Sequence, residues 1–119
     1  MQNQKSALGL DANVTALISY PIGIVALISV FIEKDNKFVR FHAFQSLLFW
    51  AVAVVLWIAV VFVMVFLAFI SSLLATLMWL LLVVVGFGVL GGIIFLAYKA
   101  FQGEMFKLPV IGDMAEKWA

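Results

Sequence analysis

The chain has 119 residues, of which 67% are hydrophobic and only 11% are charged, whereas an ordinary soluble domain carries about 25% charged residues. A soluble domain of this length leaves roughly a third of its surface in water, so it cannot hide this much apolar side chain, and the composition indicates a membrane protein rather than a soluble enzyme. The net charge of +1 offers no basic field for nucleic acid, and the lack of cysteine excludes disulfides and thiolate chemistry.

The first predicted element follows a short tail, residues 1–11. Residues 12–32 carry no charge, and as a helix they are about 31 Å long, which matches a hydrocarbon core of about 30 Å. This predicts a first transmembrane helix. Pro21 lacks an N–H for the carbonyl of Leu17 and is expected to kink the helix, either to fit the bundle or to offer a free carbonyl to a solute. A cleaved signal peptide is the alternative interpretation of residues 12–32, although a basic region before them is missing.

Small residues form a regular series along this first helix. In lipid, close packing of helices depends on small side chains that let two backbones approach. The spacing of the series is 4, 3, 4 and 3, which is typical of a helix pair. We therefore expect a packing face made by Ala12, Ala16, Ser19, Gly23 and Ala26.

A polar cluster follows in the loop 33–40 and at the start of the next helix. His42, Gln45 and Ser46 share one helix face. They are expected either to fix packing by hydrogen bonds or to form a ligand, proton or lipid-headgroup site. A single histidine makes no metal site. Two nearby cations are expected to hold lipid phosphates or to pair with local carboxylates, so the candidate site consists of Lys37, Arg40, His42, Gln45 and Ser46.

Residues 41–98 contain no charge over 58 positions. Two long helices fit this length best, so we predict transmembrane helices over 41–70 and 73–98 with a turn near Ser71. Gly88 and Gly92 form a GxxxG motif that predicts helix–helix contact. The glycines also spell GxGxxG, but a dinucleotide site needs a preceding strand, so we reject that interpretation.

Residues 99–119 again carry charges, with apolar residues between them, and are predicted to lie on the membrane surface. Three spans would place the loop 33–40 and this tail on one side and the N-terminus on the other. The first side holds six basic residues and the second holds Lys5 alone. The positive-inside rule then predicts an inner-membrane protein with its N-terminus outside and its C-terminus in the cytoplasm.

Three stretches, GLDANVTALISY, NKFVRFHAFQS and YKAFQGEMFKLPVIGDMAE, resemble small bacterial and archaeal membrane proteins of unknown function that are grouped with the Tic-type subunit of the chloroplast inner-envelope protein translocon. The resemblance covers nearly the whole chain. It implies a membrane-embedded component of protein import, for which a channel role is considered. Plastid members are usually read as four-helix proteins, whereas this sequence has three clear apolar stretches.

Together these features predict an all-α polytopic membrane protein with three transmembrane helices and a C-terminal interfacial segment. We expect no cofactor and no enzymatic activity, because no pair of acid/base groups forms a recognisable catalytic set. The expected function is that of a homo-oligomeric subunit or accessory of a protein-translocation or membrane-assembly system. Its expected partners are the bilayer, further copies of itself and a membrane protein, but no nucleic acid. The alternative is a small oligomeric channel or transporter, with Pro21, His42 and Gln45 along its path.

Overall fold

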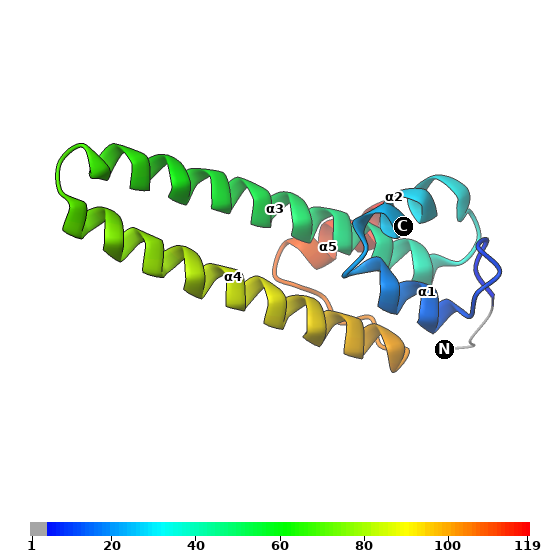
Figure 1. The fold of residues 1–119 in the computed structure, drawn as a ribbon. Helices are drawn as coiled ribbons and strands as arrows, with labels where there is room; N and C mark the ends of the chain where they lie inside the picture. Colours follow the sequence, from blue (N-terminus) through cyan, green and yellow to red (C-terminus); the bar gives the residue numbers. More distant parts are fainter. Residues whose placement is uncertain (1–4) are drawn as a thin grey trace. The chain divides into compact units, whose positions relative to one another are not determined.

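The computed structural model describes residues 5–119, which form five helices in the order seen in Figure 1. The helices are α1 (Ala12–Ser19), α2 (Gly23–Ile32), α3 (Lys37–Ala68), α4 (Ser72–Phe101) and α5 (Ile111–Trp118). Among the described residues the only β-type pairing is an isolated bridge between Lys5 and Asp11. The predicted all-α class is therefore confirmed.

The chain divides into two compact units. The first, which we call the apolar unit, comprises residues 51–92, in which the last part of α3 and the first part of α4 are joined by a turn at residues 69–71. Its side chains are mostly exposed and apolar, as at Phe62 and Phe87. With 32 and 30 residues, α3 and α4 are long and apolar enough to cross a membrane. These two helices correspond to the predicted spans 41–70 and 73–98: α3 begins and ends a few residues earlier than predicted, and α4 extends beyond its predicted span at both ends.

The predicted span 12–32 is not one helix. It forms α1, with 8 residues, and α2, with 10 residues, which are about 12 and 15 Å long and thus each too short for a core of about 30 Å. Pro21 cannot continue the hydrogen-bond ladder, and Ile22 has an extended backbone with φ −116° and ψ 90°. The expected kink is thus a complete break, and the prediction of three spans is not confirmed.

The second unit, which we call the polar unit, comprises residues 5–50 and 93–119 of the described chain. Its largest fully buried side chains include Tyr20, Phe41 and His42. The backbone N–H of Ala7 donates to the carboxylate of Glu33, so both ends of the segment 12–32 lie together. The predicted topology placed residues 7 and 33 on opposite sides of a hydrocarbon core of about 30 Å, and this contact gives that placement no support.

Candidate functional site

The site is built on the break between α1 and α2. The carbonyl groups of the last residue of α1 and of the residue after it accept hydrogen bonds from side chains of α3. Ser46 Oγ donates to the carbonyl of Ser19 at 2.6 Å, and Trp50 Nε1 donates to the carbonyl of Tyr20 at 2.8 Å. Ser46 and Trp50 are four residues apart and therefore lie on one face of α3. The carbonyls of Ser19 and Tyr20 are thus engaged within the protein rather than offered to a solute.

Beside the break, three polar side chains are joined in a buried cluster. Tyr20 Oη lies 2.6 Å from His42 Nδ1 and accepts a hydrogen bond from Gln45 Nε2 at 2.9 Å. His42 Nε2 lies 2.9 Å from the carbonyl of Glu104. A carbonyl can only accept, so Nε2 carries the imidazole proton and Nδ1 accepts from the tyrosine hydroxyl. This arrangement uses neutral histidine and satisfies every group in it.

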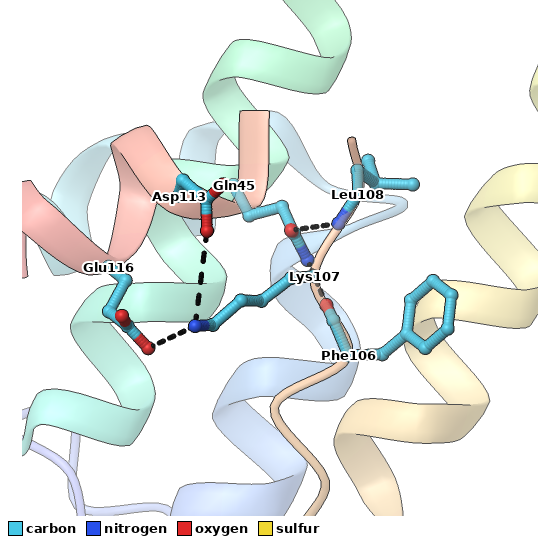
Figure 2. Close-up of polar contacts among 6 residues, drawn as sticks. All are labelled: Gln45, Phe106, Lys107, Leu108, Asp113 and Glu116. Carbon is cyan, nitrogen blue, oxygen red and sulfur yellow. Dashed lines mark hydrogen bonds and ion pairs between the residues drawn. The ribbon is translucent and has the colours of Figure 1, made fainter. Parts of the chain in front are cut away.

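The same cluster holds the segment 104–108, which we call the tail segment. Gln45 Nε2 donates to the carbonyl of Phe106 at 2.8 Å, and the N–H of Leu108 donates to Gln45 Oε1 at 3.0 Å (Figure 2). The side-chain amide of Gln45 thereby pairs with the backbone on both sides of Lys107, much as a neighbouring strand would. Only backbone groups of the tail segment take part, so these hydrogen bonds do not depend on the side chains of the segment.

Lys107 ties the tail segment to α5. Its Nζ lies 2.7 Å from a carboxylate oxygen of Glu116 and 4.0 Å from one of Asp113 (Figure 2). The hydrogen bond to Glu116, aided by the charges of both carboxylates, raises the pKa of Lys107 above its ordinary value of 10.5. A raised pKa means that the ion pair is complete at neutral pH and is lost only as the pH rises through the folded-state pKa. Gly112 is packed closely here, because an added Cβ would lie 2.6 Å from Lys107 Cα.

Arg40 joins the end of α2 to the end of α5. Its guanidinium donates to the carbonyls of Val30 and Glu33 and to those of Trp118 and Ala119. The same group lies 5.3 Å from the centre of the Phe44 ring. The expected contact of Arg40 with lipid phosphate therefore competes with four carbonyls of its own chain. Lys37, the other predicted phosphate ligand, is exposed and lies outside these contacts.

The predicted packing residues fall into two groups. In the polar unit, Ala12, Ala16, Ser19 and Ala26 are fully buried and Gly23 is half-buried. In the apolar unit, Gly92 is half-buried and Gly88 is exposed, and apart from the adjacent residues and the nearby backbone of α4 no atom of the described chain lies within 4 Å of a Cβ added at Gly88. The small residues of α1 and α2 thus serve packing inside the polar unit, whereas the GxxxG face of α4 is open at Gly88.

Helix periodicity predicts the shared face of His42, Gln45 and Ser46, but it does not predict the residues that surround them. Tyr20 and Trp50 were not selected, although an aromatic residue before a proline and a tryptophan four residues after Ser46 were available signals. Pro21 is exposed and takes no part in the cluster. Among residues 5–119, no group of three or more histidine, aspartate or glutamate side chains could hold a metal ion.

The fold and the cluster define an all-helical membrane protein whose polar side chains bond to its own backbone. The chain belongs to the magnetosome magnetite crystal formation protein family, whose model matches residues 3–115. It is 36% identical over 118 residues to a UPF0132 membrane protein of Methanocaldococcus jannaschii, covering 97% of this chain and 94% of the relative. A UPF0132 membrane protein of Archaeoglobus fulgidus is 38% identical over 112 residues, which are 91% of this chain and 95% of the relative. No solved structure matches.

These relatives support a small uncharacterised membrane family and hence a membrane location. They do not show the expected relation to the Tic-type translocon subunit. The family name refers to magnetite crystal formation, and the relatives' names refer to the membrane. Neither name speaks for a channel or for protein translocation.

Proposed function

We propose that this protein is a non-enzymatic membrane-assembly protein, which carries the polar unit on two membrane spans and associates with further copies of itself. The observation that carries the proposal is the use of the polar side chains. His42, Gln45, Ser46 and Arg40 all bond to groups of their own chain. A catalytic group has to reach a substrate, and a pore-lining group has to reach water, so these bonds favour a structural role over catalysis or transport.

Of the two systems expected from the sequence, membrane assembly is retained, because translocation depended on the Tic-type resemblance alone. The charge distribution supports a particular topology. The apolar unit contains no basic residue, and all seven basic residues lie outside it: Lys5, Lys34, Lys37, Arg40, Lys99, Lys107 and Lys117. Two crossings return the chain to the side from which it started, so the positive-inside rule places both ends of the described chain in the cytoplasm.

Cysteine labelling tests this topology, because the natural sequence has no cysteine. Single variants Lys5→Cys, Ser71→Cys and Lys117→Cys are treated with a membrane-impermeant maleimide in intact cells and in inverted vesicles. We expect labelling of Ser71→Cys from outside and of the other two only from the cytoplasmic side. Labelling of Lys5→Cys in intact cells would restore the three-span topology and overturn the one proposed here.

The outer face of α2 supports contact between the polar unit and lipid. Four exposed apolar side chains follow the i, i+3, i+4, i+7 pattern of one helix face: Ile24, Leu27, Ile28 and Phe31. Phe31 is 73% exposed, and an apolar stripe of this kind is stable in contact with hydrocarbon rather than water. A helix of about 15 Å reaches halfway through the hydrocarbon core, so α2 is suited to enter the bilayer without crossing it.

Self-association is proposed through the face of α4 that contains Gly88 and Gly92. Small residues four positions apart let two membrane helices approach closely, and Gly88 has no close neighbour in the described chain. Native mass spectrometry in nanodiscs tests this: the wild type is expected to show a dimer or larger oligomer, and Gly88→Leu is expected to reduce it. Leu90→Ala is the matched control, because position 90 points about 200° away from position 88. A monomer in every lipid tested would refute self-association.

A further inference from the structure

The hydrogen bonds of the buried cluster form one directed chain that begins and ends on the tail segment. The N–H of Leu108 donates to Gln45 Oε1, and Gln45 Nε2 donates to Tyr20 Oη. The Tyr20 hydroxyl donates to His42 Nδ1, and His42 Nε2 donates to the carbonyl of Glu104. Each of the three side chains, Gln45, Tyr20 and His42, is both donor and acceptor, so the orientation of one fixes the orientation of the next.

From this geometry we propose that protonation of His42 releases the tail segment from α3. A second proton on the imidazole converts Nδ1 from an acceptor into a donor. The Tyr20 hydroxyl then has to accept from His42 and must find another acceptor for its own hydrogen. Gln45 lies beside it at 2.9 Å but presents its Nε2 donor. Only rotation of the amide by half a turn brings the Gln45 oxygen to Tyr20.

That rotation breaks both hydrogen bonds between Gln45 and the tail segment. The amide oxygen would face the carbonyl of Phe106, and the amide N–H would face the N–H of Leu108, so both present bonds become repulsive pairs. Water cannot supply the missing hydrogen bonds among these three side chains, because Tyr20 and Gln45 are 0% exposed and His42 is 1% exposed. A buried donor or acceptor without a partner costs more than a bond gains, so the tail segment separates instead.

The groups around His42 do not offset the loss of hydrogen bonds that follows its protonation. Tyr20, at the helix break, faces the imidazole. The rings of Phe38 and Phe41 of α3 pack edge-on against it, with ring centroids 4.6 and 5.0 Å from that of the imidazole. The carboxylate of Glu104 in the tail segment pairs with Lys99 of α4 at 3.1 Å. Three other charged groups of the adjoining elements have partners: Arg40 on carbonyls of α2 and α5, Glu33 on the N–H groups of Ala7 and Asn36, and Lys107 on Asp113 and Glu116. Lys37 of α3 and Lys117 of α5 are exposed.

The experiment follows proton binding and tail release in the same sample. The chain contains one histidine, so ¹⁵N-histidine labelling of the full protein in nanodiscs gives an unambiguous imidazole signal between pH 7 and pH 4. Hydrogen exchange of the peptide 104–108, corrected for the intrinsic rate at each pH, reports docking. We expect protection of this peptide to fall by about tenfold or more with the same midpoint as the imidazole, while residues 51–92 keep their protection.

Two variants separate this mechanism from general acid destabilisation. His42→Gln retains an amide donor for Glu104 and cannot titrate, so tail protection is expected to be independent of pH. Tyr20→Phe keeps the histidine but interrupts the chain, so the imidazole is expected to titrate without release of the tail segment. The proposal is overturned if the wild-type tail stays protected after imidazolium has formed, if no imidazolium forms by pH 4, or if Tyr20→Phe retains the full loss of protection.

Discussion

Replacing Gln45 with leucine, Gln45→Leu, removes three hydrogen bonds with little change in side-chain volume. The bonds join Gln45 to Tyr20 at 2.9 Å, to Phe106 at 2.8 Å and to Leu108 at 3.0 Å. At about 0.5–1.5 kcal/mol each, they sum to between about 1.5 and 4.5 kcal/mol. Phe106 is exposed and Leu108 is half-buried, so water can replace part of the loss, and we expect a destabilisation of about 2 kcal/mol.

The matched control is Gln102→Leu. Gln102 makes one side-chain bond, to Tyr98 Oη at 2.9 Å on the exposed surface, so its removal is expected to change stability by no more than about 0.5 kcal/mol. Unfolding in SDS, followed by circular dichroism, measures the stability of both variants. Tryptic cleavage after Lys107 measures undocking of the tail segment and is expected to accelerate about 30-fold in Gln45→Leu, since 1.4 kcal/mol corresponds to about tenfold. Equal stability and equal cleavage of the two variants would refute the reasoning.

Gly112→Ala is expected to destabilise the protein by about 1–3 kcal/mol in the same assay, because the new methyl group meets the backbone of Lys107; Gly88→Ala, where an added Cβ has space, should leave stability unchanged. Arg40→Lys is expected to cost about 2 kcal/mol and to expose α5 to proteolysis, because a lysine cannot serve carbonyls of two helices at once; unchanged proteolysis would contradict this. In ¹⁵N NMR at pH 7, the imidazole of His42 is expected to be neutral with its proton on Nε2, and a proton on Nδ1 would show that the hydrogen-bond chain is assigned wrongly.

The long helices could be predicted from the sequence because length and lack of charge decide them. Residues 41–98 contain no charged side chain, and a helix is the only simple way for such a segment to satisfy its backbone in lipid. The same reasoning failed for residues 12–32. Their length suits a crossing, but the break at Pro21 is stabilised by Ser46 and Trp50 of another helix, which no local pattern reveals.

The candidate site, too, could be predicted from the sequence only in part. The shared face of His42, Gln45 and Ser46 follows from helix periodicity, and all three side chains are buried. The partners of His42 and Gln45 in the tail segment lie 61 to 63 residues away in the sequence. No periodicity connects residues so distant in the sequence, and the contact of Ala7 with Glu33 likewise appears only in the fold.

The dependence of Gln45 and His42 on the tail segment also sets an order for biogenesis. When α3 leaves the ribosome, the break between α1 and α2 can already receive Ser46 and Trp50, but the acceptors at Glu104 and Phe106 have not been synthesised. Those acceptors follow α4 in the sequence and are therefore synthesised after both long helices. Completion of the polar unit therefore requires that both long helices have been synthesised, and a chain that ends before residue 104 lacks the hydrogen-bond partners of His42 and Gln45 in the tail segment.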